Sequence, residues 1–448
     1  MNKRFWILVA IWGIVDFVCA MLCEIHEDEA YYRLYGQFLS WGYFDHPPMV
    51  GLMTWLSSIF ITGESLIAKN MSVRLMTVLL HIGTVVLTWM CIPRKGEVTK
   101  REQNGFFIIA ASMVMFSTYG FITTPDAPLL FFTALFICLY KRYLESPSWG
   151  IALLLGVSMA GMVYSKYMGA LAILLVVLSN WRLVKDIKLW CAVLLGVLLT
   201  TPHIIWQYEN GFPSMVYHLV SRSQEWTIGY TLEYLPNQLL VFNPIAYILA
   251  WILVWKSLRS TDAYERGLAF LFAGFQVFFF VMTVRGHVEP HWTVLITIGA
   301  IVMLTGEWNK REVFFGRKWV RNAMVAMLCT VMAARAVLCL NVLPESTGLA
   351  NKRPYYEAMH KASEGLPVVL GGSFQAASLY RFYYDDQAVV VRQWWDRYTE
   401  YDLLHLEEQL MGQKVCLLRD DGRGEPCVID GYTFKKRIVE ELSKDDLK

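Results

Sequence analysis

The chain has 448 residues, of which 56% are hydrophobic, 15% aromatic and only 17% charged. Soluble domains carry about 25% charged residues, so the composition excludes an ordinary soluble enzyme and indicates an integral membrane protein with a modest soluble part. The net charge of +2 gives no sign of nucleic-acid binding, and we expect no nucleic-acid partner.

Eleven apolar segments are candidates to cross a bilayer, which takes about 20 residues per helix. The first follows MNKR and resembles a signal peptide, but no small-residue cleavage site follows it, so we interpret it as a retained transmembrane helix. The fifth and sixth segments are short. The predicted spans are residues 5–23, 72–92, 105–122, 127–142, 149–165, 168–181, 189–206, 238–255, 267–284, 290–306 and 322–342.

The distribution of positive charge predicts the orientation. With a cytoplasmic N-terminus, the inside segments hold 19 Lys and Arg residues and the outside loops hold five. Cytoplasmic loops are enriched in these residues. We therefore expect the N-terminus inside and the loop 24–71 outside. The odd number of spans also puts the C-terminal part, residues 343–448, outside, after a transmembrane domain of residues 1–342.

The first outside loop has two segments with helical spacing. One predicted helix covers Asp28 to Trp41, with Gly42 as its stop, and a second, amphipathic helix begins at Pro47. We expect both helices to lie on the outer membrane surface. The pair Asp45-His46 precedes the second helix, where free backbone N–H groups attract anions such as phosphate.

The other outside loops add acids, imidazoles and cations at the same membrane face. This combination suits an anionic lipid substrate together with a general base. The ionisable side chains of these loops include Asp126, Lys166, His218, Arg222, Arg285, His287, Glu289 and His291.

The C-terminal part alternates predicted strands (366–372, 388–391 and 414–418) with predicted helices (375–384 and 401–410). This order is typical of a small α/β domain. The domain has no phosphate-loop or nucleophile-elbow pattern, so a lid, an acceptor-docking surface and a stabilising cap all fit. The nine cysteines show no CxxC spacing, which argues against a zinc ribbon or a disulfide scaffold, but Cys416 and Cys427 can pair if this part is extracytoplasmic.

The opening loop carries a resemblance to a known family. HEDEAYYRLYGQFLSWGYFDHPP (residues 26–48) resembles the first extracytoplasmic loop of the protein O-mannosyltransferase and aminoarabinose-transferase superfamily of GT-C glycosyltransferases. TTPDAP (123–128) resembles the family's second acidic loop, and residues 201–223 and 285–292 resemble later, weaker motifs.

The resemblance implies a polytopic α-helical membrane protein of the GT-C type, with about 11 transmembrane helices and a small extracytoplasmic α/β domain. It implies inverting transfer of a sugar from a polyprenyl-phosphate donor to a lipid, glycan or protein acceptor on the periplasmic face. Short loops and the lack of a retrieval signal favour a bacterial plasma (inner) membrane.

The same resemblance assigns catalytic roles to three acids. Asp28 matches the leading acid of the family and is the expected general base, although it also suits a helix N-cap. Glu29 is expected to orient the acceptor or the base, or to be a solvated acid of the first turn. Asp126 is expected to contact the acceptor or the sugar, or to cap the fourth span.

Four side chains are candidates to bind the donor phosphate. His46 stands where relatives carry a cation or a His near this phosphate, although Pro47 also makes it a plain helix-start residue. Arg222 and Arg285 lie in the later motifs, and the arginine fork suits phosphate. Lys166 is either a phosphate ligand or a side chain that extends to the lipid headgroups.

The sequence indicates no certain cofactor. Asp45 with His218 can bind a divalent metal cation, as the resemblance allows, but two ligands are a weak signal. The alternating His287, Glu289 and His291 are either a second metal site or a hydrated loop.

Two further features of the sequence lead to expectations. Asp16 lies inside the first span, so we expect it to face the bundle interior beside a polar partner. Trp41, Tyr43 and Trp55 are expected in the interfacial aromatic belt, although Trp41 or Tyr43 can also stack on a sugar.

The main alternative function is a transporter or flippase for a polyprenyl-linked glycan. Such a protein would carry ionisable residues near the bilayer midplane on several helices. Here most of the candidate residues lie in loops on one face, which favours the enzyme.

Overall fold

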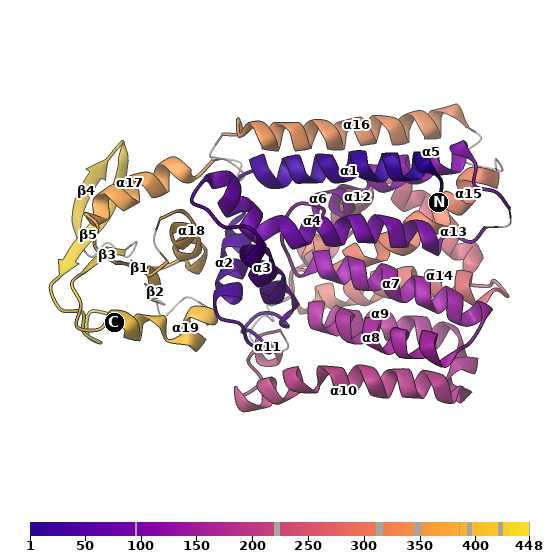
Figure 1. Ribbon diagram of the computed structural model, residues 1–448, viewed down its shortest axis with the longest axis horizontal. Helices are drawn as coiled ribbons and strands as arrows, with labels where there is room; N and C mark the ends of the chain where they lie inside the picture. Colours follow the sequence, from indigo (N-terminus) through magenta and orange to yellow (C-terminus); the bar gives the residue numbers. More distant parts are fainter. Residues whose placement is uncertain are drawn as a thin grey trace.

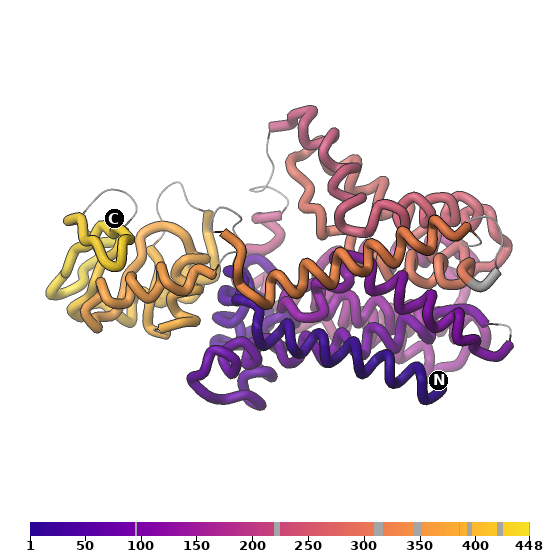
Figure 2. The backbone as a smooth tube through the Cα atoms, turned by 90° about the horizontal axis from the view of Figure 1, so that it is seen from above, coloured from indigo at the N-terminus to yellow at the C-terminus, as the bar shows by residue number. Residues whose placement is uncertain are grey.

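The computed structural model of the protein describes residues 1–94, 96–218, 225–310, 317–344, 351–384, 386–391, 397–419 and 424–447. A long helical bundle carries a small α/β domain at one end, and the N-terminus lies toward the other end of the bundle (Figure 1, Figure 2).

The bundle consists of helices that run mostly along its long axis (Figure 1). They are α1 (Lys3–Leu22), α4 (Leu66–Cys91), α5 (Lys100–Ser112), α6 (Val114–Thr118), α7 (Asp126–Glu145), α8 (Trp149–Ser165), α9 (Met168–Ser179), α10 (Ile187–Glu209), α12 (Ile228–Phe242), α13 (Pro244–Ser257), α14 (Ala263–Met282), α15 (Thr297–Lys310) and α16 (Lys318–Leu340). Short elements connect them: η1 (Trp181–Lys185), α11 (Pro213–Val216), η3 (Thr283–Arg285) and η4 (Pro290–Ile296).

Helices occupy every predicted span, so the fold class is confirmed. Among the described residues, seven helices are long and apolar enough to cross a membrane, or eight if the bent pair α12–α13 is one span. The short α8 and α9 are also apolar.

Two predicted spans are not single straight helices. The span predicted at 105–122 is broken at Met113, whose extended backbone separates α5 from α6. The span predicted at 238–255 is bent by 102° between α12 and α13. The bend lies at Asn243, with φ of 130°, before Pro244, which has no N–H to continue the helix.

A buried acid lies inside the bundle, as predicted from its position in the first span. Asp16 is fully buried, its Oδ1 lies 2.5 Å from Nη2 of Arg335, and its Oδ2 lies 2.7 Å from Nδ1 of His81. The prediction of an interior-facing acid with polar partners is confirmed.

The first loop forms two helices, α2 (Glu27–Gln37) and α3 (Met49–Phe60). His26 caps α2 in a capping box with Glu29. The predicted stop at Gly42 is wrong, because α2 ends at Gln37. Gly42 instead allows close packing, since an added Cβ would lie 2.3 Å from the ring of Trp206.

Helix α2 is enclosed between the bundle and the C-terminal domain, where it packs against α18 (Phe374–Tyr383) (Figure 1). The C-terminal domain therefore covers α2, and the position of this helix at the outer membrane surface stays a prediction. The consecutive tyrosines of this helix, Tyr31 and Tyr32, are buried. Asp28 lies in the first turn of the same helix and is therefore close to the junction of the two domains.

The C-terminal domain contains a five-stranded sheet in the order β2-β1-β3-β5-β4. The predicted strands are present as the parallel part, β1 (Val368–Gly371), β2 (Val389–Val391) and β3 (Val415–Arg419). Sequence reasoning missed the antiparallel hairpin β4 (Glu425–Ile429) and β5 (Tyr432–Val439). The remaining elements are α17 (Arg353–Ser363), α18, α19 (Glu400–Leu404) and η6 (Leu406–Leu410).

The two cysteines of this domain do not form a disulfide. Cys416 lies on β3 and Cys427 on β4, with β5 between these strands. Two strand spacings amount to about 9.6 Å, which exceeds the Cα separation that a disulfide can bridge.

Candidate active site

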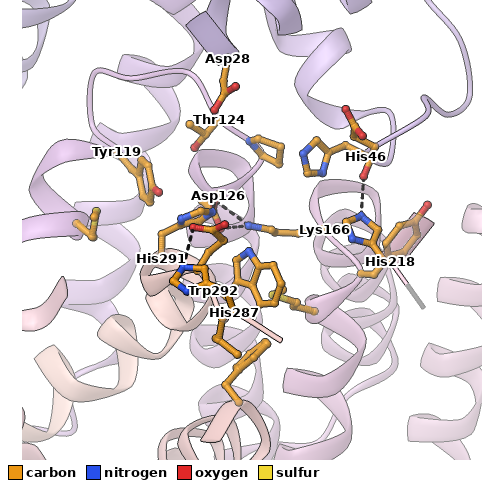
Figure 3. A pocket seen from close by; sticks show the side chains of 18 of the residues that line it. Asp28, His46, Tyr119, Thr124, Asp126, Lys166, His218, His287, His291 and Trp292 are labelled. Atoms are coloured by element: carbon orange, nitrogen blue, oxygen red, sulfur yellow. Dashed lines mark hydrogen bonds and ion pairs between the residues drawn. The ribbon is translucent and has the colours of Figure 1, made fainter. Parts of the chain in front are cut away.

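A cavity of about 930 Å³ lies where the bundle meets the first loop and the C-terminal domain. One part of its wall is apolar and consists of side chains from the bundle. The other part carries the acids, imidazoles and cations of the loops (Figure 3). The apolar residues are Met115, Ile122, Met168, Leu171, Phe278, Phe279, Met282, Val288 and Leu338.

Asp28 faces this cavity from the first turn of α2 (Figure 3). Its side chain is 44% exposed, but the exposed part faces the cavity, where the surrounding protein removes much of the water. This desolvation raises the pKa of the Asp28 carboxyl above its usual range, although His26, with Nδ1 3.8 Å away, opposes the shift. Asp28 therefore combines access to the cavity with increased basicity.

Asp126 and Lys166 form a buried ion pair on the same cavity wall (Figure 3). Nζ of Lys166 lies 2.9 Å from each carboxylate oxygen of Asp126. Asp126 begins α7 and makes no side-chain capping hydrogen bond, while Lys166 is the C-cap of α8. The pair joins the TTPDAP loop to the α8–α9 junction, and Asp126 does not have the alternative role of a helix cap.

His46 lines the cavity beside Tyr32, whose hydroxyl lies 3.2 Å from Nε2. Burial lowers the pKa of His46 well below its usual value, and the positive charge of Lys166 adds to the shift. His46 is therefore neutral at neutral pH and can offer a hydrogen bond to an anion but not a positive charge.

Arg397, from the C-terminal domain, reaches the cavity and pairs with Asp45. Its two terminal nitrogens lie 2.5 and 3.3 Å from the two carboxylate oxygens. The guanidinium also lies over the rings of Tyr217 and Phe374. A residue more than 350 positions later in the chain thus holds the end of the first loop.

Comparisons with known proteins agree with this architecture. Residues 45–206 match the family described as dolichyl-phosphate-mannose-protein mannosyltransferase. The structure of ArnT from Cupriavidus metallidurans in the apo state superposes with a TM-score of 0.66 at 15% identity, covering 96% of each chain. The same protein bound to undecaprenyl phosphate gives a TM-score of 0.65 at 16% identity, covering 99% of each.

The chain therefore has the fold of ArnT over nearly its whole length, and about a third of it matches the mannosyltransferase family. A curated relative, the lipid A galacturonosyltransferase RgtD of Rhizobium johnstonii (strain DSM 114642 / LMG 32736 / 3841), is 25% identical over 312 residues. That alignment covers 64% of this chain and 62% of the relative, so it spans less than two thirds of the relative's length.

The structure places Glu29 in the protein interior. Its side chain is fully buried outside the cavity lining. Its carboxylate pairs with Arg74 at 2.6 Å and accepts hydrogen bonds from the backbone N–H groups of His26 and Thr123. The alternative of a solvated acid is wrong, because these partners hold the carboxylate in the protein interior. The role of Glu29 in orienting the base stays a prediction.

The proposed metal pair does not have the geometry of a metal site. The Asp45 carboxylate is held by Arg397, and Nε2 of His218 contacts the backbone oxygen of Asp45 at 3.0 Å rather than lying beside its carboxylate. A cation would have to displace the guanidinium, so these residues do not fit a divalent metal. Among the described residues, three metal-ligand side chains converge only at a cysteine cluster in the bundle.

The loop before η4 supplies further polar groups to the cavity. Arg285, His287, Glu289 and His291 all line it. His287 lies 2.9 Å from Glu233 and 3.7 Å from Glu289, and the ring of His291 lies 4.0 Å from Asp126. Arg222, the remaining phosphate candidate, lies outside the described residues.

The aromatic residues of the first loop have two different environments. Trp41 and Trp55 are exposed, as a membrane-interface position requires. Tyr43 is fully buried and stacks on Tyr35 with ring centroids 3.9 Å apart, so its expected place in an aromatic belt or on a sugar is wrong.

Sequence reasoning missed two residues of the C-terminal domain at this site. Arg397 and Glu400 follow a strand in a part whose function the sequence did not indicate. The Glu400 carboxylate is buried and accepts a hydrogen bond from the backbone N–H of Phe44 at 2.7 Å. Arg397 precedes α19 and Glu400 begins it, and neither position gave a signal that would have placed it against the first loop.

Proposed function

We propose that this protein is an integral-membrane inverting glycosyltransferase. It moves a sugar from a polyprenyl-phosphate donor to a lipid, glycan or protein acceptor on the periplasmic face of the inner membrane. The observation that carries the proposal is the cavity itself, because an accessible acid of raised pKa, Asp28, and a buried cation, Lys166, share one space that has an apolar wall.

Asp28 is proposed as the general base. The acceptor hydroxyl attacks the anomeric carbon, its proton passes to the Asp28 carboxylate, and the bond from that carbon to the phosphate oxygen breaks. Attack opposite the leaving group inverts the anomeric configuration. A base whose pKa is raised toward the working pH transfers protons more efficiently than an ordinary surface carboxylate.

The leaving polyprenyl phosphate gains negative charge that cations must stabilise. The Lys166 ammonium has three donors, two of which point at Asp126, so one is available for a phosphate oxygen. Asp126 thereby positions Lys166. Arg285 and the neutral His46 line the same cavity and complete the proposed phosphate site.

The substrates and the orientation follow from similarity and from charge. Undecaprenyl phosphate, bound in the ArnT structure, is the first donor lipid to test. Lipid A, named in the curated relative, is the first acceptor to test. The excess of Lys and Arg in the predicted inside segments favours a cytoplasmic N-terminus, with the cavity and the C-terminal domain outside.

Reconstituted proteoliposomes with a polyprenyl-phosphate sugar labelled in the sugar test this function. We expect the label to move to an added acceptor and the free polyprenyl phosphate to accumulate in equal amount. Movement of the intact labelled lipid between leaflets, without transfer, would instead support the flippase. The acceptors to be tested are lipid A and its precursors, isolated from cells that lack the protein.

A further inference from the structure

Three thiols meet where α1 and α16 end, close to the C-terminal domain (Figure 1). Sγ of Cys23 lies 3.5 Å from Sγ of Cys339, which lies 3.6 Å from Sγ of Cys19. The three sulfurs are all within 4.8 Å of one another. Cys19 and Cys23 are four residues apart and therefore share one helix face, which points at α16.

These distances match the spacing of sulfurs around a zinc ion. Two thiolates on a tetrahedral zinc with bonds of about 2.3 Å lie roughly 3.8 Å apart. Small side-chain adjustments would therefore bring all three sulfurs to bonding distance of one ion. Three protein ligands leave one coordination position for water, and Cys339 is only partly buried, so water can approach from its side.

The charges around the cluster also suit a divalent ion. Cys19 and Cys23 are buried, so three thiolates alone would place three uncompensated negative charges in the protein. A zinc ion reduces this charge to one. Nε of Arg335 donates to Sγ of Cys19 at 3.3 Å, as a hydrogen-bonded neighbour of a metal-bound thiolate does, while Asp16 holds the other side of the guanidinium.

We propose that Cys19, Cys23 and Cys339 bind one zinc ion that fastens the end of the first helix to the end of the last helix of the bundle. Asn341 already joins these ends through a hydrogen bond to the backbone oxygen of Leu22 at 3.1 Å. The chain continues from α16 into the domain that supplies Arg397 to the cavity. The ion therefore stabilises the base of that domain beside the cavity, whose wall includes the neighbouring Leu338.

Cobalt titration of the full-length protein in detergent tests the site directly. The protein is reduced, stripped with a chelator and titrated with Co²⁺, which gives a thiolate charge-transfer absorption. We expect one equivalent to bind and zinc to displace it. Cys339→Ser should lose this absorption and bind zinc at least about tenfold more weakly. Mutation of a residue that only hydrogen-bonds to a metal ligand already lowers metal affinity by about tenfold or more, and loss of a ligand should lower it at least as much.

Cys329→Ser is the matched control, because Cys329 is exposed on the same helix and should leave binding unchanged. Wild-type protein should also unfold at a lower temperature after chelation and recover with zinc, a result that does not depend on folding of a variant. The proposal would be overturned if the wild type gave no absorption or if Cys339→Ser retained it. Peptide mapping that found a native disulfide among these cysteines would overturn it as well.

Discussion

At the scale of single residues, two neighbouring acids of α2 have opposite environments. Asp28 faces the cavity, whereas Glu29 is buried against Arg74, which lies on α4. Successive helical residues point in directions about 100° apart, so adjacent acids commonly differ in this way. The sequence identified both acids, but their separation depends on a partner 45 residues away, and no local pattern reveals that partner.

Glu29→Gln is expected to destabilise the protein by about 3–5 kcal/mol, because it leaves the Arg74 guanidinium buried without its counterion. Asp28→Asn, at the neighbouring position, should leave the unfolding temperature nearly unchanged. Thermal unfolding of both variants in detergent measures the difference. A Glu29→Gln variant that is stable but inactive would instead indicate that Glu29 takes part in catalysis.

Lys166→Gln is expected to weaken the binding of undecaprenyl phosphate. A hydrogen bond to a charged group contributes about 1.5–3 kcal/mol, so the dissociation constant should rise about tenfold or more. Lys69→Gln is the control, since Lys69 contacts Glu64 and the backbone of Tyr383 outside the cavity lining. Titration calorimetry with the lipid phosphate measures both, and equal affinities would remove Lys166 from the phosphate site.

At the scale of elements, the C-terminal domain is an integral part of the cavity wall. Arg397 holds Asp45, and Glu400 holds the backbone of Phe44, so the domain fixes the end of the first loop. The alternation of apolar strands with helices was enough to predict β1, β2 and β3. It did not predict β4, whose residues are mostly exposed and include Pro426, nor the contact with the first loop, which depends on tertiary packing.

The docking of this domain is expected to weaken as the pH rises. Burial raises the pKa of Glu400 from its ordinary value of 4.5 to about 8. The folded state therefore holds a proton that the unfolded chain releases. The stability that this proton contributes is complete below about pH 4.5 and is lost as the pH rises to about 8.

Glu400→Gln has no proton to lose and keeps an oxygen for the N–H of Phe44. Its unfolding temperature should rise relative to the wild type as the pH is raised through this window. Glu408→Gln is the control, because Glu408 is exposed in the same domain. A constant difference between Glu400→Gln and the wild type at all pH values would contradict the raised pKa.

At the scale of the whole molecule, the apolar spans largely determine what could be predicted. Because the bilayer requires long apolar helices, the spans were readable from the sequence. The break at Met113 was not, since Met113 carries no strong local signal. The bend lies at Asn243-Pro244, a dipeptide typical of turns, but the apolar residues on both sides led to the prediction of one continuous span. The N-terminus and the C-terminal domain lie toward opposite ends of the bundle (Figure 2), as an odd number of spans requires.

The orientation is expected to place the C-terminal domain outside the cytoplasm. Alkaline phosphatase, which is active only after export, should be active when fused after the last residue and inactive when fused at Lys100, in a predicted inside loop. Activity confined to the Lys100 fusion would reverse the topology and with it the periplasmic position of the cavity.

The central claim is that Asp28 activates the acceptor while other groups hold the donor phosphate. The most direct measurement compares transfer rate and undecaprenyl-phosphate affinity in wild type, Asp28→Asn and the control Glu27→Gln, whose side chain pairs with Lys352. We predict that Asp28→Asn lowers the transfer rate by about 10²- to 10⁴-fold with unchanged lipid affinity, and that the control keeps both. Near-wild-type transfer by Asp28→Asn would contradict the account.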